Sequence, residues 1–133
     1  MKKVLIVDDD EEICQELAQI IKDEGYDTRA VYNGIAAKDE LASKKFDLVL
    51  LDLKIPGING LDLLKMIKRE KENPCVLVLS ARPMRRLMKE KAAWGSNKEG
   101  EDEEDEIFSL ADGFINKPFN VELLLDKIKE LTA

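Results

Sequence analysis

The chain has 133 residues, of which 44% are hydrophobic, and a formal net charge of −7 at pH 7. This length and apolar fraction predict one domain over residues 1–133, while the acidic balance argues against direct binding to the phosphates of nucleic acid. No apolar run approaches the roughly 20 residues of a membrane span, and no cleavage pattern follows the N-terminal run, so we expect a cytoplasmic protein.

Five short apolar runs predict β-strands. They are nearly continuous rather than alternating, which is typical of strands that are buried on both faces of a parallel sheet. In chain order the runs are VLIV (4–7), TRAVY (28–32), FDLVLL (46–51), CVLVL (75–79) and GFIN (113–116).

Helical patterns alternate with these runs. Apolar residues at helical spacing predict helices over 13–24 and 61–67, and over 121–131 after an Asn120 cap. A weaker pattern over 35–43 fills the space between its neighbouring strands. The strict alternation predicts an α/β fold with a doubly wound, five-stranded parallel sheet, a flavodoxin-like (βα)5 arrangement in three α/β/α layers.

One interval is longer than the others. More than thirty residues separate Leu79 from Gly113, which is long for a connection in a compact domain. We interpret residues 82–106 as an atypical charged insertion between the fourth strand and the fourth helix, which we expect over 101–111. Within it, residues 99–106 hold seven acids and no base, so the rest of the chain is neutral and the charge is a local feature.

The usual zinc-binding residues are scarce. The chain has no histidine, which removes the most common metal ligand and general base. Cys14 and Cys75 lie in apolar-patterned segments, so we interpret them as small buried side chains rather than as a disulfide or a metal pair.

Polar residues directly follow four of the apolar runs: Asp8 and Asp9, Asp52, Ser80 and Lys117. Open α/β sheets bind ligands beyond the carboxyl ends of their strands. The first and third strands should be neighbours, and the three carboxylates would then repel one another unless a cation such as Mg²⁺ lies among them. Ser80 and Lys117 would face an anion, for which a phosphoryl group is the best candidate. Singly, each residue is more often a loop or cap residue, so the prediction depends on their joint placement.

The motifs around these residues resemble the receiver domain of two-component response regulators. VLIVDDD, LVLLDLKIPGINGLDLL, VLVLSA and DGFINKPF occur in the family's order, and the likeness runs from Lys3 to Leu131 with 82–106 outside it. The resemblance implies that Asp52 accepts a phosphoryl group from a histidine kinase or a histidine phosphotransfer protein. The chain would then change conformation and signal to a downstream effector protein, and it would catalyse only its own phosphorylation and dephosphorylation rather than act as an enzyme.

The resemblance also assigns the metal ligands. Asp9, Asp52 and the backbone carbonyl of Lys54 would bind Mg²⁺, and Asp8 would reach the ion directly or through water. Lys117 would neutralise charge on the phosphoryl oxygens during transfer. We expect Asp10 to cap the first helix instead.

In the same family a hydroxyl residue and an aromatic residue form the conformational switch. By this resemblance Ser80 would move to bond the phosphoryl group, and the ring of Phe114 would turn into the space that Ser80 leaves. The simpler alternatives are a turn residue for Ser80 and an ordinary core residue for Phe114.

Two other functions stay open from the sequence. Asp8 and Asp10 after a strand also fit the nucleophile and acid–base pair of a haloacid-dehalogenase-like phosphatase, although Glu12 stands where that family prefers a small hydroxyl residue. A pseudo-receiver that acts only as a binding module is the other alternative, but every catalytic position of the receiver motif is filled.

Overall fold

The computed structural model describes residues 1–80, 105–117 and 119–133. Residues 105–110, just before the last strand, are helical. The remaining helices and strands are β1 (Lys3–Val7), α1 (Glu11–Asp23), β2 (Asp27–Val31), α2 (Gly34–Ser43), β3 (Leu48–Asp52), α3 (Gly60–Arg69), β4 (Cys75–Ser80), β5 (Gly113–Asn116) and α6 (Val121–Leu131).

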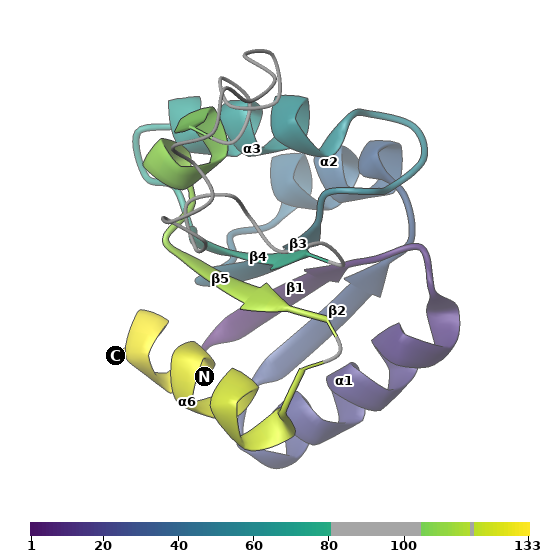
Figure 1. Cartoon of the computed structure of the whole chain (residues 1–133), viewed down its shortest axis with the longest axis vertical. Helices are drawn as coiled ribbons and strands as arrows, with labels where there is room; N and C mark the ends of the chain where they lie inside the picture. The colour runs from purple at the N-terminus through teal and green to yellow at the C-terminus, as the bar shows by residue number, and fades with distance from the viewer. Residues whose placement is uncertain (81–104, 118) are drawn as a thin grey trace, which may run out of the picture.

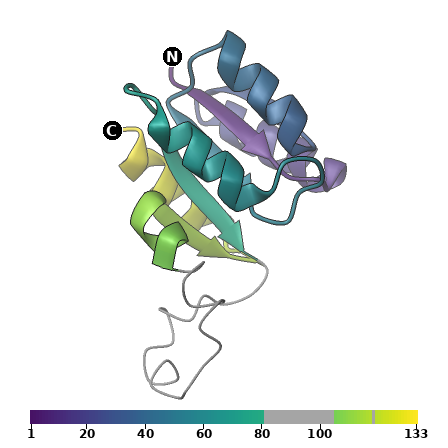
Figure 2. The ribbon, with the colours of Figure 1, turned by 90° about the horizontal axis from the view of Figure 1, so that it is seen from above.

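The five strands form one parallel sheet in the order β2-β1-β3-β4-β5. Figure 2 shows the strand arrows pointing toward a common edge. The predicted doubly wound α/β fold is therefore confirmed. The register pairs Val7 of β1 with Leu51 of β3 and Ser80 of β4 with Asn116 of β5, so the carboxyl ends of these four strands are nearly level.

Each face of the sheet packs against its own helices. Figure 1 shows α2 and α3 on one face and α1 and α6 on the other. Residues of β1 alternate between the two cores: Leu5 and Val7 face the α2–α3 side, whereas Val4 and Ile6 face the α1–α6 side. All four are fully buried, which explains why the strands read as continuous apolar runs.

The helices begin where capping residues predict. The Asp10 side chain accepts a hydrogen bond from the Ile13 N–H at 3.1 Å, which confirms Asp10 as the cap of α1. Asn120 caps α6 through the Leu123 N–H, and Asn33 caps α2. The boundaries of β2, β3 and α1 differ by one or two residues from the predicted runs, because hydrophobic patterns locate an element better than its ends.

The interpretation of residues 82–106 as a charged insertion falls almost entirely outside the described residues. The helix predicted over 101–111 is present over residues 105–110 within the described part. Glu106, the last acid of the acidic run, forms an ion pair with Lys65 of α3 at 2.8 Å.

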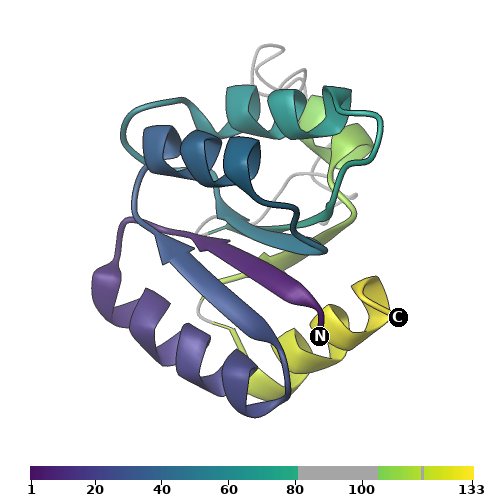
Figure 3. The same cartoon turned by 180° about the vertical axis from the view of Figure 1, so that it is seen from behind.

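The N-terminus lies beside the C-terminal end of α6, at the opposite end of the strands from their carboxyl edge (Figure 3). Among the described helices, none has the length and hydropathy that a membrane span requires.

Lys68, near the end of α3, joins three segments of the chain. Its ammonium donates hydrogen bonds to Asn73 Oδ1 at 3.1 Å, to the Pro74 carbonyl at 3.0 Å and to Asp112 Oδ2 at 2.6 Å. The same Asp112 oxygen accepts the N–H of Val76 at 2.8 Å. The Lys68 side chain is only 14% exposed, so these bonds are partly shielded from water.

We expect Lys68→Met to lower the free energy of unfolding by about 1–3 kcal/mol, because Asp112 and the Pro74 carbonyl lose a charged donor. Urea denaturation of the purified chain measures this change. Lys71→Met is the matched control, since Lys71 is exposed and forms no ion pair among the described residues. Equal losses in the two variants would contradict a structural role for Lys68.

Candidate functional site

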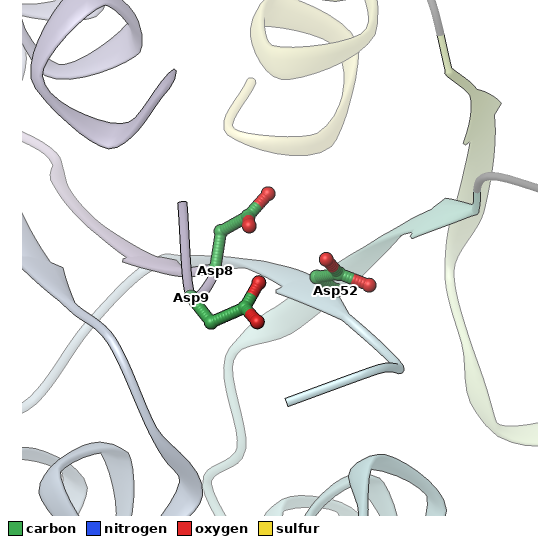
Figure 4. A group of neighbouring side chains, drawn as sticks. All are labelled: Asp8, Asp9 and Asp52. Carbon is green, nitrogen blue, oxygen red and sulfur yellow. The ribbon is translucent and has the colours of Figure 1, made fainter. Parts of the chain in front are cut away.

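Three carboxylates meet at the carboxyl edge of the sheet. Asp8 and Asp9 directly follow β1, and Asp52 is the last residue of β3. Because β1 and β3 are paired neighbours, one carboxylate oxygen of each residue lies within 4.8 Å of the others. Figure 4 shows the three side chains gathered at the ends of the two strands. The prediction that these acids come together is therefore confirmed.

The three acids differ in their surroundings. Asp8 is fully buried and Asp52 is 8% exposed, whereas Asp9 is exposed to solvent. The Asp8 N–H donates to the Val31 carbonyl at 3.2 Å, and Asp8 Oδ1 accepts the Asp10 N–H at 3.0 Å. Two hydrogen bonds thus hold Asp8 in place, whereas Asp9 is the acid of the cluster that solutes can reach.

Lys117 follows β5 and reaches across the sheet edge to two of the acids. Its N–H donates to the Ser80 carbonyl at 2.7 Å, which holds the residue beside the end of β4. Its ammonium lies 2.5 Å from Asp8 Oδ2 and 3.2 Å from Asp52 Oδ2. Burial alone would lower the pKa of Lys117, but the hydrogen bond to Asp8 and the charge of Asp52 raise it. Lys117 is therefore a permanent cation inside the acidic cluster.

Asp52 carries a poorly solvated carboxylate. Burial is the largest effect and raises its pKa, and the charge of Asp8 raises it further. The Lys54 N–H, which donates to Asp52 Oδ1 at 2.9 Å, and the Lys117 ammonium oppose this rise but do not cancel it. A carboxylate with a raised pKa is more basic, and this makes it a stronger nucleophile.

The loop between Asp52 and α3 is held by close backbone contacts. A Cβ on Gly60 would lie 2.5 Å from the Leu53 carbonyl oxygen and 2.6 Å from Leu53 Cα, so only glycine allows α3 to begin there. On the other side, the Gly34 N–H of α2 donates to the Pro56 carbonyl at 2.9 Å. Gly57 has a φ of 89°, a conformation that favours glycine. These contacts fix the backbone that presents Asp52 and Lys54.

Ser80 and Phe114 lie on the same face of the sheet. Phe114 pairs in register with Val78 of β4, and Ser80 follows Val78 by two residues, so the three side chains point the same way. Phe114 is half-buried, and its ring centroid lies 4.4 Å from that of Phe108, with 39° between the ring planes. The two side chains thus share one face of the sheet, and their role as a switch pair remains a prediction.

A known protein family matches nearly the whole chain. The response regulator receiver domain family matches residues 4–129. The chain belongs to this receiver family. As a member of this family, the receiver domain is not an enzyme in the classical sense, as predicted. Receiver domains act with histidine kinases and phosphotransferases.

Two curated relatives give the extent of the likeness. Response regulator ArlR of Staphylococcus saprophyticus is 29% identical over 134 residues, a match that covers 98% of this receiver domain and 52% of ArlR. Sporulation initiation phosphotransferase F of Bacillus subtilis is 42% identical over 80 residues, covering 60% of this chain and 64% of that protein. The chain therefore spans about half the length of ArlR.

Two solved structures resemble the receiver domain closely. The response regulator TrrA of Thermotoga maritima, in complex with Mg²⁺–BeF, has a TM-score of 0.75 and 30% identity, with 98% of this chain and 99% of TrrA covered. A CheY-like receiver domain protein of Methanospirillum hungatei has a TM-score of 0.78 and 27% identity, with 98% and 92% covered. The acidic triad of this receiver domain is typical of the Mg²⁺-binding site of such proteins.

Cys14 is part of the receiver site in a way that sequence reasoning missed. It is fully buried, as predicted, but its thiol also donates to the Asp8 carbonyl at 3.2 Å. Burial first, and then the charges of Asp8 and Asp10, raise the pKa of the thiol to about 12. The apolar pattern of α1 signals burial and contains no signal for this hydrogen bond.

We expect the Cys14 thiol to resist iodoacetamide at mildly alkaline pH in the folded receiver domain, because the thiolate is the reactive form. A Cys75→Ser background leaves Cys14 as the single target, and mass spectrometry follows its alkylation. Urea should expose the thiol and make alkylation rapid. Equal rates in buffer and in urea would contradict the buried, hydrogen-bonded thiol.

Proposed function

We propose that the chain is a phosphorylatable receiver in which Asp52 accepts a phosphoryl group from the phosphohistidine of a histidine kinase or a histidine phosphotransfer protein. The observation that carries the proposal is the gathering of three carboxylates within 4.8 Å, two of which, those of Asp8 and Asp52, pair with the Lys117 ammonium. A carboxylate nucleophile, a set of oxygen ligands and a fixed cation are the groups that phosphoryl transfer uses.

The donor set fits Mg²⁺. The clustered side-chain ligands among the described residues are all carboxylates, and Mg²⁺ prefers oxygen ligands and retains several waters. The solvent-exposed Asp9 gives a hydrated ion access. Asp9, Asp52 and the Lys54 carbonyl would hold Mg²⁺, and Asp8 would contact it directly or through water. When bound, the ion supplies positive charge at the phosphoryl oxygens.

Asp52 performs the covalent step. One of its oxygens forms the new bond to phosphorus while the bond from phosphorus to the histidine nitrogen breaks, and the electron pair leaves with the imidazole. The burial that raises the pKa of Asp52 makes this oxygen a better nucleophile. The Lys54 N–H on Asp52 Oδ1 holds the carboxylate in a single orientation during the attack.

Lys117 and Ser80 bind the transferred group. The Lys117 ammonium, which lies 3.2 Å from Asp52 Oδ2, needs only a small shift to reach a phosphoryl oxygen on Asp52. Ser80 ends the strand beside Asp52 and supplies a hydroxyl from the other side. As Ser80 moves toward the phosphoryl group, Phe114 on the same sheet face turns into the vacated space, and the changed surface signals to a downstream effector protein.

The family assignment favours this function over a phosphatase that uses Asp8 as its nucleophile. Asp8 is fully buried, and its side chain is only 1% exposed, against 12% for that of Asp52. Such a carboxylate is poorly placed to attack a substrate. Asp52 is less enclosed and ends the neighbouring strand.

Incubation with acetyl phosphate and Mg²⁺, followed by intact-mass spectrometry, tests the proposal. We expect wild type to gain one base-labile phosphoryl group, and we expect Asp52→Asn or a chelator to abolish the gain. Asp62→Asn, which changes an exposed acid in α3, is the matched control and should react like wild type. Reaction that requires Asp8 but not Asp52 would support the phosphatase, and no reaction would support a pseudo-receiver.

A further inference from the structure

The segment that precedes β5, residues 106–112, is joined to α3 by an ion pair at each end. Lys65 of α3 contacts Glu106 at 2.8 Å, and Lys68 contacts Asp112 at 2.6 Å. The two lysines are three residues apart and therefore lie on one face of the helix. Between these ion pairs, Ile107 is only 7% exposed and packs into the core on the α2–α3 side. The position of this segment is thus set by α3 and by the core.

The side chain of Phe108, which belongs to this segment, contacts the ring of Phe114. The ring centroids are 4.4 Å apart with 39° between the planes, and both side chains pack against the same core. The backbone of Phe114 is held separately, by its pairing with Val78 in the sheet. A rotation of the Phe114 side chain would therefore break the ring contact, since Phe108 cannot follow it.

The ring contact occurs together with a direct ion pair between Asp52 and Lys117. In this arrangement Asp52 Oδ2 accepts a hydrogen bond from the Lys117 ammonium at 3.2 Å. A phosphoryl group on Asp52 would replace this pair with one between Lys117 and a phosphoryl oxygen. Any contact that stabilises Phe114 in the present orientation therefore stabilises the unmodified protein relative to the switched one.

We propose that Phe108 is a positioning residue for the switch, because its ring, held in place by the Lys65–Glu106 and Lys68–Asp112 ion pairs, keeps Phe114 in the orientation of the unmodified protein. This inference rests on the proposed function, in which Phe114 turns when Asp52 is phosphorylated. In this role Phe108 acts through its ring contact with Phe114 and takes no part itself in metal binding or phosphoryl transfer.

Binding of Mg²⁺ with beryllium fluoride, the pair present in the TrrA complex, measures the cost of switching. Loss of one aromatic pair should favour the switched protein by roughly threefold to tenfold. We expect Phe108→Leu to bind beryllium fluoride more tightly by this factor and to react faster with acetyl phosphate. Phe108→Tyr keeps the ring and should stay within about twofold of wild type.

Two further variants separate a positioning role of Phe108 from a general effect on the stability of the fold. In a Phe114→Leu background the ring contact is already absent, so Phe108→Leu should have no additional effect on the affinity. Phe46→Leu changes another half-buried phenylalanine that packs against the same core. It should lower the free energy of unfolding and leave the affinity unchanged.

The outcomes distinguish this inference from the proposed function. If wild type binds beryllium fluoride and Phe108→Leu binds it equally or more weakly, the positioning role is wrong and the proposed function stands. An effect that persists in the Phe114→Leu background also overturns the role. If wild type fails to bind in the presence of Mg²⁺, both proposals fall. Phe108→Met keeps an apolar side chain of similar length and provides the same comparison if Phe108→Leu does not fold.

Discussion

Replacement of Lys117 by methionine is expected to slow phosphorylation of Asp52 on the order of 10²–10³-fold, and at the same time to strengthen Mg²⁺ binding. The loss of rate follows because a fixed cation no longer stabilises the charge that develops on the phosphoryl oxygens. The gain in affinity follows because the ammonium lies 2.5 Å from Asp8 and 3.2 Å from Asp52, where it competes with the metal for the carboxylates.

The predicted changes in phosphorylation rate and in Mg²⁺ affinity have opposite signs, and this makes the prediction specific. A general loss of structure would weaken metal binding and phosphorylation together, whereas removal of a competing cation strengthens one and weakens the other. Titration with Mg²⁺, followed by amide NMR, gives the affinity, and intact mass after acetyl phosphate gives the rate. Lys38→Met, at an exposed position with no ion pair in the described part of the chain, should change neither. Weaker Mg²⁺ binding in Lys117→Met would contradict the competition.

Gly60→Ala is expected to lower the free energy of unfolding by about 2–3 kcal/mol and to weaken Mg²⁺ binding. The added Cβ would meet the Leu53 backbone at 2.5–2.6 Å, and backbone atoms cannot move aside as a flexible side chain can. The resulting shift would displace the residues on either side of Leu53, which are the metal ligands Asp52 and Lys54 of the proposed site.

The direction of the change in the free energy of unfolding is informative. At an unobstructed helix position, alanine is more favourable than glycine by about 1 kcal/mol, so a stabilised variant would contradict the close contact. Urea denaturation and Mg²⁺ titration measure the two effects. Asp62→Ala, in the first turn of the same helix and exposed, is the matched control and should leave Mg²⁺ binding unchanged.

The sheet could be predicted from the sequence because burial on two faces leaves a simple pattern. Val4 to Val7 are apolar without interruption, and the structure divides them between two cores. The meeting of Asp8, Asp9 and Asp52 could also be predicted, because parallel strands bring their carboxyl ends to one edge. Such reasoning needs only the strand order and the residue that follows each strand.

Other features depend on packing that no local pattern reports. The hydrogen bond from the Cys14 thiol to the Asp8 carbonyl depends on how α1 is oriented about its own axis against β1. The ring pair of Phe108 and Phe114 requires the position of one helix relative to a strand. The insertion over 82–106 was inferred from its charge and length, and it stays a prediction because almost all of it lies beyond the described residues.

The identity of the phosphorylated residue tests the central claim most directly. After reaction with acetyl phosphate and Mg²⁺, borohydride reduces an aspartyl phosphate to homoserine, and peptide mass spectrometry then finds the converted residue. The receiver function predicts homoserine at position 52 and at no other aspartate, with conversion lost when a chelator is present. Conversion at position 8, or none at all in protein that binds Mg²⁺, would contradict it.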